Sequence, residues 1–167
     1  AAIKAIATTL LKSLMRRIAR LSAVPSRALP ENVSSFKLSD SLPDDVQQLF
    51  TQAEIQDVEF GLAWYQNLAQ SVYKNDGGVR IYVLRESGVP VAAMPVHVIE
   101  KYFAHQVQSL SNFYTSLYAP IVAPGVTVKS LADFIAAIRN AHTSAGSFRF
   151  DLMDPQAPTY NRLMQAL

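Results

Sequence analysis

Residues 110–120 carry the side chains of this protein that are best suited to binding a substrate. Four of its polar residues, one with an amide and three with hydroxyl groups, stand among apolar and aromatic neighbours: Asn112, Tyr114, Thr115 and Tyr118. Pockets combine a few convergent polar groups with apolar walls. We therefore predict that the segment is a strand running into a pocket wall and that these four residues bind substrate. The alternative is that the tyrosines are amphipathic core residues and that Asn112 caps a turn.

The other titratable candidates are scattered along the chain. His97 lies within an apolar run, where a histidine is more often a hydrogen-bonding partner than a base. Asp151 and Asp154 flank the end of a predicted strand and could orient an amine, although an acid before proline is ordinary turn chemistry. The remaining histidines, His105 and His142, have no acid at metal-ligand spacing. We therefore assign no catalytic base and expect no metal site.

Composition and motifs exclude several functional classes. The 167 residues include no cysteine, which excludes disulfides, a thiolate nucleophile and cysteine metal sites. The sequence has no P-loop and no Gly-x-Ser-x-Gly elbow. Its basic residues do not alternate with aromatic ones as in a single-strand binder. We expect no nucleic-acid partner and a cytoplasmic location.

The beginning of the chain differs in charge from the rest. The net charge is +2, yet six lysines and arginines precede the first acid, Glu31. Apolar residues recur there at three- and four-residue spacing: Ile3, Ile6, Leu10, Leu14, Ile18 and Leu21. This pattern predicts a basic amphipathic helix over residues 1–24 and a proline-containing linker over residues 25–31. The helix could dock on the domain or a partner chain, contact an anionic membrane surface, or serve as a targeting segment.

Residues 32–167 are expected to form one domain. A polar turn at Glu86, Ser87 and Gly88 separates two β-branched runs and predicts a hairpin. The expected order is a strand at 33–38, helices at 43–53 and 59–73, hairpin strands at 81–84 and 89–99, a helix from about 127 to 144, a strand at 148–152 and a helix beginning near 160. The last helical pattern still runs at Leu167, so we expect the domain to be incomplete or to be one half of a larger protein.

Three local segments, in this order of elements, carry a family resemblance. They are FGLAWYQNL at residues 60–68, GVPVAAMP at 88–95 and LSNFYTSLYAP at 110–120. Together they resemble the GNAT acyltransferase superfamily, in particular the N-terminal half of the BioF2-like, CelD-type and FemAB-related acyltransferases. The resemblance covers residues 33–167. It implies an α+β (α/β) fold with a mixed, mostly antiparallel sheet flanked by helices.

The resemblance also implies an activity, which is N-acyl transfer from acetyl-CoA or another acyl-CoA to an amine. The acceptor would be a small molecule or peptide, such as a sugar, a peptide or an envelope precursor, and no prosthetic group is implied. GNAT domains that bind acetyl-CoA carry Arg/Gln-x-x-Gly-x-Gly/Ala, because bare amides at a helix N-terminus must approach the pyrophosphate. The matching residues 118–128 read YAPIVAPGVTV, with one glycine, two prolines and no arginine or glutamine. We therefore expect the acyl-CoA site to lie outside this chain.

Two functional hypotheses remain open. In the first, the chain is part of an N-acyltransferase whose second GNAT half holds the acyl donor. In the second, it is a non-catalytic module that recognises a substrate or partner and contacts a membrane surface through its basic helix.

Overall fold

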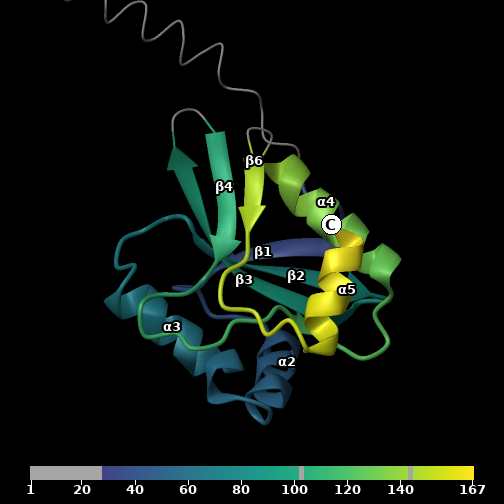
Figure 1. Ribbon diagram of the computed structural model, residues 1–167, viewed down its shortest axis with the longest axis horizontal. Helices are drawn as coiled ribbons and strands as arrows, with labels where there is room; N and C mark the ends of the chain where they lie inside the picture. Colours follow the sequence, from purple (N-terminus) through teal and green to yellow (C-terminus); the bar gives the residue numbers. More distant parts are fainter. Residues whose placement is uncertain (1–27, 102–103, 143–144) are drawn as a thin grey trace, which may run out of the picture.

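Two long antiparallel strands, β2 (Val79–Glu86) and β3 (Val89–Lys101), form the centre of the molecule (Figure 1). They are joined at Ser87 and Gly88, whose φ angles of 51° and 83° are typical of a two-residue hairpin turn. The predicted hairpin is confirmed. The computed structural model describes residues 28–101, 104–142 and 145–167.

Six strands of the described residues form one sheet, in the order β1-β2-β3-β4-β6 with β5 paired to β3. Every pairing is antiparallel except that of β4 with β6, which is parallel. The sheet is therefore mixed and mostly antiparallel, as predicted. The four shorter strands are β1 (Val33–Lys37), β4 (Ala104–Ser109), β5 (Ile121–Val122) and β6 (Ala145–Arg149).

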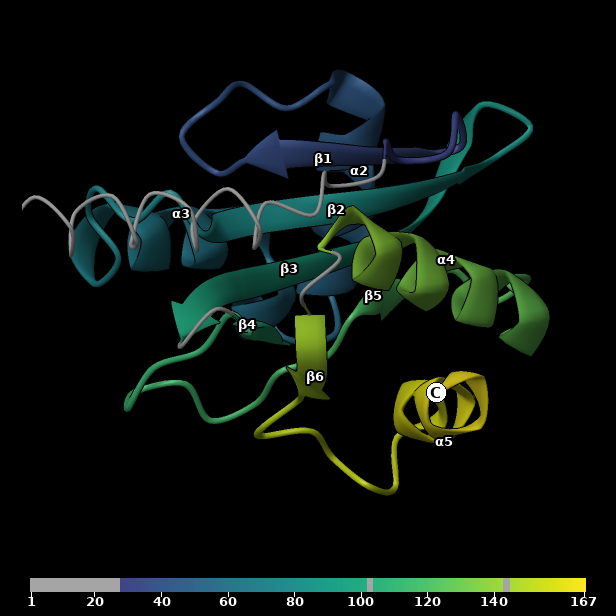
Figure 2. The same ribbon diagram turned by 90° about the horizontal axis from the view of Figure 1, so that it is seen from above.

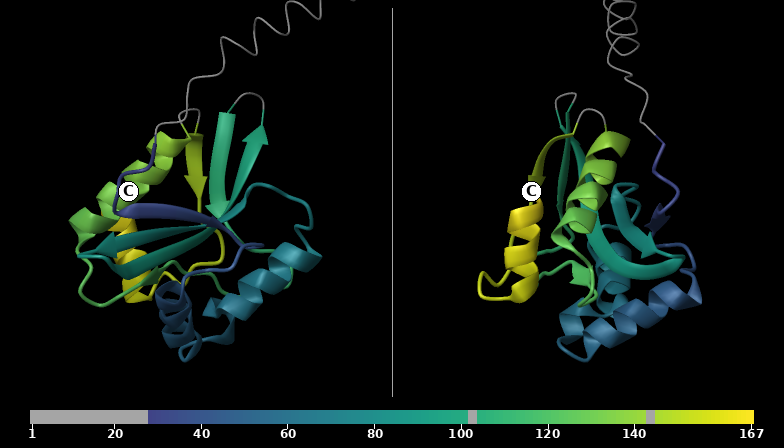
Figure 3. Two further views of the ribbon diagram at one scale, coloured as in Figure 1. Left: turned by 180° about the vertical axis from the view of Figure 1, so that it is seen from behind. Right: turned by 90° about the vertical axis from the view of Figure 1, so that its right-hand side faces the viewer.

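Helices cover both faces of the sheet (Figure 3). They are α2 (Asp44–Glu54), a short 3-10 helix η1 (Val58–Phe60), α3 (Leu62–Ser71), α4 (Val128–Ala141) and α5 (Pro158–Ala166). The predicted helix over residues 59–73 is thus divided at Gly61, where the backbone is extended with φ −73° and ψ 151°. The predicted final helix begins two residues early, because Pro158 occupies its first turn.

The alternation of side chains along β2 sends its apolar residues into two cores. Ile81 packs with Phe50 and Leu68 of α2 and α3 on one face. Leu84 packs with residues of α4 and α5, including Ile138, on the other. The helices α4 and α5 lie side by side over this second core (Figure 2).

The parallel strands β4 and β6 pair along almost their whole length. Their pairing runs from His105 and Ala145 to Gln108 and Arg149, where β6 ends. The chain after β4 leaves the sheet and returns as β5 on β3, whereas the chain after β6 turns away to form α5. Among the residues described, β5 therefore pairs with β3 alone, and no strand lies between β5 and the segment that leads into α5.

Residues 110–120 do not form the predicted strand. The strand ends upstream, at Ser109, and the segment continues as an irregular loop. The amide N–H of Tyr114 donates to Oδ1 of Asn112 over 3.0 Å, and Thr115 N–H donates to the Asn112 carbonyl over 3.1 Å. These local bonds take backbone groups that a strand would use for pairing, so a turn forms instead.

The predicted helix over residues 1–24, and residues 25–27 of the predicted linker, lie outside the described residues. Within the described residues, no helix is long and apolar enough to span a bilayer.

Candidate functional site

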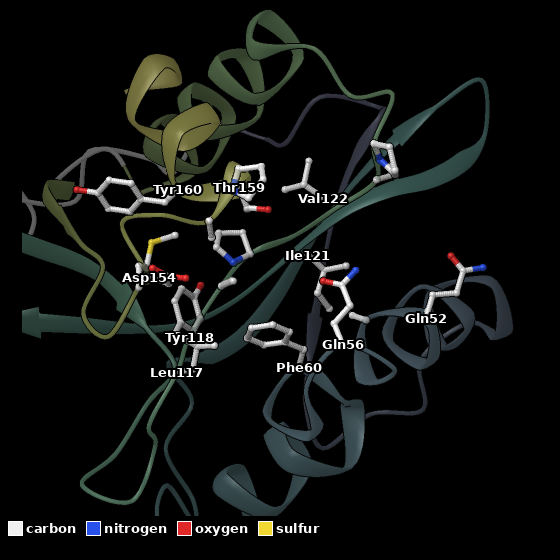
Figure 4. Close-up of a pocket in the computed structure, with 18 of the residues that line it drawn as sticks. Gln52, Gln56, Phe60, Leu117, Tyr118, Ile121, Val122, Asp154, Thr159 and Tyr160 are labelled. Carbon is white, nitrogen blue, oxygen red and sulfur yellow. The ribbon is translucent and has the colours of Figure 1, made fainter.

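A cavity of about 350 Å³ lies where β5 and the segment leading into α5 diverge (Figure 4). One wall comes from α2 and η1, which contribute Gln52 and Phe60, with Gln56 between them. The back comes from residues 117–124, around β5. The opposite wall comes from residues 153–160, at the start of α5. Three segments distant in sequence therefore build one cavity.

The lining of this cavity is chiefly apolar. Its polar side chains are glutamines, hydroxyls and one carboxylate: Gln52, Gln56, Thr159, Tyr118, Tyr160 and Asp154. Among the described residues, Asp154 is the one charged member of the lining, and it is exposed at the edge. Its Oδ1 accepts a hydrogen bond of 2.8 Å from the Gln156 N–H, which fixes the carboxylate in a turn. Within the part of the chain that the structure describes, Asp154 forms no ion pair. The site therefore offers a negative charge beside an apolar cavity.

Glu59 holds one wall of the cavity in place from η1. Its carboxylate accepts from Ser116 Oγ at 2.6 Å, from Leu117 N–H at 2.8 Å and from Ser116 N–H at 3.0 Å. Burial by itself would raise the pKa of Glu59, but the hydrogen bonds from Ser116 and Leu117 outweigh it and lower that pKa. Glu59 is thus an ionised clamp between η1 and the loop that enters the cavity wall.

Tyr118 contributes its ring to the cavity and turns its hydroxyl into the protein. The side chain is 1% exposed, and its hydroxyl donates to the Pro95 carbonyl over 2.8 Å. Its ring stacks on Phe150 with the two planes 8° apart. Burial raises the pKa of Tyr118 well above its ordinary value. Tyr118 therefore forms part of the cavity wall, and its hydroxyl proton is already hydrogen-bonded to the Pro95 carbonyl.

The structure separates the other three predicted site residues from the cavity. Asn112 and Thr115 bond to each other, because Thr115 Oγ1 donates to Asn112 Oδ1 and accepts from Asn112 N–H, both over 3.0 Å. Tyr114 is 79% exposed and contacts the ring of Phe113. Of the four residues, Tyr118 lines the cavity, and the other three form a turn on the loop that leads to it.

Sequence reasoning did not identify Gln56, Phe60, Met153 or Thr159 as cavity residues. Gln56 lies between the helices predicted at 43–53 and 59–73, and no local pattern marks these four residues as a group. Asp154 was noted as a residue that could orient an amine, and the structure places it at the cavity edge.

The loop before α4 does not fit the pyrophosphate of an acyl-CoA. Ala123 N–H donates to the Val91 carbonyl over 2.8 Å, and Val126 N–H donates to the Ala123 carbonyl over 3.2 Å. Pro124 has no N–H to offer. The guanidinium of Arg162 donates to the Ala123 and Val126 carbonyls, so it is already engaged. The loop therefore offers a diphosphate an interrupted row of donors, because two of its amides are bonded within the protein and Pro124 has none.

His97 lies outside the cavity lining. Its Nε2 is 2.7 Å from Asp76 Oδ2, its Nδ1 is 3.3 Å from Gln108 Nε2, and the ring of Tyr73 packs beside it. Asp151 pairs with Arg149 over 2.8 Å. The contacts of His97 hold the segment after α3 against the sheet, and the Arg149–Asp151 pair is local to the end of β6.

The other two histidines lie on the opposite face of the sheet. Their rings are 5.4 Å apart, and His142 Nε2 is 2.5 Å from the hydroxyl of Tyr82. Burial, then the nearby His105 and Arg80, lowers the pKa of His142. No cluster of three or more potential metal ligands occurs among the described residues.

Comparisons with known proteins identify the fold. A scan against protein-family models and a search of curated proteins gave no match. A ribosomal-protein-alanine N-acetyltransferase from Brucella melitensis biovar Abortus 2308 is similar in structure, with a TM-score of 0.51 over 84% of this chain and 91% of that chain at 14% sequence identity. A protein from Thermus thermophilus gives a TM-score of 0.43 over 81% of this chain and 83% of that chain at 14% identity. An aminoglycoside acetyltransferase from an uncultured soil metagenomic sample gives 0.43 over 71% and 75% at 13% identity. The chain thus has the GNAT-type acetyltransferase fold, with a mostly antiparallel sheet flanked by helices.

Proposed function

We propose that this chain is the acceptor-binding domain of a GNAT-type N-acyltransferase. One observation carries the proposal: among the described residues, the only charged side chain lining the cavity of this acetyltransferase-like fold is the carboxylate of Asp154. A primary amine is protonated at neutral pH, and a carboxylate next to an apolar surface favours that cation. Asp154 would hold the amino group of a sugar, a peptide or an envelope precursor.

The acyl donor is assigned to another part of the full enzyme. In the loop of residues 123–127 the Ala123 and Val126 amides are already bonded and Pro124 has no N–H, which is why we propose that a second GNAT half holds the acyl-CoA. The role of this chain is to bind and orient the amine. Asp154 orients the nitrogen at the cavity edge, and the apolar walls hold the part of the acceptor that enters the cavity.

The experiment compares amines with their acylated forms. A peptide with a free N-terminal amine and glucosamine are each titrated into the full chain, beside the N-acetylated peptide and N-acetylglucosamine. Isothermal calorimetry is expected to detect at least one free amine that binds more tightly than its acetylated partner, and Asp154→Asn to remove the difference. Equal binding of both members of every pair, with no effect of Asp154→Asn, would refute the acceptor site.

A second candidate function is favoured by the loop before α4, in which the Ala123 and Val126 amides are already hydrogen-bonded within the protein. If no part of the full protein holds an acyl donor, the same cavity serves a non-catalytic recognition module. Titration of acetyl-CoA into the full-length protein separates the two candidates, because only the acyltransferase requires it to bind.

A further inference from the structure

The interior of the cavity is apolar. Its buried residues are Leu49 and Ala53 from α2, the ring of Tyr118, and Pro120 and Ile121 beside β5. Met153 completes the opposite wall. An apolar cavity of about 150 Å³ accommodates benzene. The 350 Å³ here would therefore hold roughly a dozen non-hydrogen atoms of an apolar group.

The charges around the cavity restrict what the polar end of such a ligand can be. Within the described part of the chain, no lysine or arginine is among the residues that line it. The guanidinium of Arg162 on α5 is engaged, since it bonds to the Ala123 and Val126 carbonyls. Asp154 at the edge disfavours an anionic head group and favours a cationic one.

We propose that the cavity binds an amine with an unbranched aliphatic tail of about eight to ten carbons, with the tail against α2 and β5 and the ammonium at Asp154. The proposal rests on the proposed function, because it takes the cavity as the acceptor site and specifies the class of acceptor. A small polar amine would leave the apolar interior filled with water, which costs affinity.

Chain length provides the first measurement. Butylamine, hexylamine, octylamine, decylamine and dodecylamine are titrated into the full chain by calorimetry, each below its micelle concentration. Each added methylene is expected to tighten binding by about fourfold until the cavity is full near ten carbons, after which the gain stops. Binding of octylamine should also show a negative heat-capacity change, the sign of apolar burial. Affinity that does not depend on chain length would overturn the proposal.

The head group provides the second measurement. Octylamine is expected to bind at least fivefold more tightly than octanol, and octanoate to bind most weakly, because of Asp154. Asp154→Asn is expected to reduce the octylamine advantage and leave octanol binding unchanged. The octanoyl thioester of N-acetylcysteamine tests the other source of an aliphatic chain, an acyl donor. If this thioester binds more tightly than octylamine, the tail belongs to the acyl group and the proposal is wrong.

A matched pair of variants localises the ligand. Thr159 lies in the cavity wall, so Thr159→Phe should fill the space and weaken octylamine binding at least tenfold. Thr51 is exposed on α2 and outside the lining, so Thr51→Phe should leave binding unchanged. Equal effects of the two changes would place the ligand elsewhere and overturn the proposal.

The two proposals fail in different ways. Chain-length dependence without discrimination between octylamine and octanol would refute the amine acceptor site. If short amines bind more tightly than their acetylated forms but affinity does not depend on chain length, the acceptor site is supported and the proposal of an aliphatic tail is refuted.

Discussion

Removal of the Glu59 clamp is expected to destabilise the protein measurably. The carboxylate accepts three hydrogen bonds of 3.0 Å or less, from Ser116 Oγ and from the N–H groups of Ser116 and Leu117. Bonds to a charged group contribute about 1.5–3 kcal/mol each when fully buried. Glu59 is exposed enough that water replaces part of the loss. We expect Glu59→Ala to lower the free energy of unfolding by about 2 kcal/mol and Glu59→Gln by about 1 kcal/mol.

The effect should depend on pH in one direction. The hydrogen bonds keep the pKa of Glu59 below its ordinary value, near 4.3 for a glutamate. A depressed pKa contributes stability that is fully present above the ordinary value and is lost as the pH falls through the folded-state value. The gap in stability between wild type and Glu59→Gln should therefore be constant from about pH 8 to pH 5 and shrink steadily below about pH 4.

Urea unfolding followed by circular dichroism measures this gap at each pH. Glu86→Gln is the matched control, because Glu86 is exposed at the end of β2 and its side chain forms no hydrogen bond among the described residues. The control should differ from wild type by less than about 0.5 kcal/mol. A Glu59→Gln protein as stable as wild type at neutral pH would refute the clamp. A gap that stays unchanged at acidic pH would show that the carboxylate charge is not its cause.

Three further predictions concern the cavity wall, the loop turn and the basic segment. Tyr118→Phe should lower the free energy of unfolding by about 1–2 kcal/mol, because the Pro95 carbonyl loses its 2.8 Å partner; an unchanged urea midpoint would contradict this. Asn112→Ala combined with Tyr114→Phe, in the full-length protein, should leave the substrate KM and turnover unchanged, because neither residue lines the cavity; a raised KM would show that this loop binds substrate. The full chain should co-sediment with anionic liposomes at low salt and be released near ~1 M salt, since each cation contributes on the order of 1 kcal/mol and salt screens it. A chain that starts at Glu31 should remain in the supernatant, and its aggregation or loss of cooperative melting would show instead that the N-terminal segment packs on the domain.

Much of the fold could be predicted from the sequence, because its signals are local. The turn at Ser87 and Gly88 between two β-branched runs predicts a hairpin in any tertiary context. The apolar stripe through Leu131, Phe134 and Ile138 predicts α4, whose N-cap Thr127 accepts from Ser130 N–H over 3.0 Å. The order of such elements, together with the family resemblance carried by residues 60–68, 88–95 and 110–120, predicted the mostly antiparallel sheet flanked by helices.

The loop of residues 110–120 shows where local reasoning fails. Its aromatic and β-branched residues favour a strand, but the Asn112 side chain bonds to the backbone at Tyr114 and a turn results. Which tendency prevails depends on whether a neighbouring strand offers pairing at that place. After Ser109 the strand partner of β3 is supplied by β5 instead.

The sequence by itself determined the hairpin, the helices and the absence of cysteine chemistry, because these depend on residues close together in the chain or on composition alone. Only the tertiary structure decided the site. Glu59 reaches Ser116 across 57 positions, and Asp154 lines the same cavity as Gln56 because the chain after β4 returns to β3 as β5 while the chain after β6 leads into α5. A cavity of this kind depends on how strands separate and helices pack, and those distances are set by the whole core rather than by any local pattern.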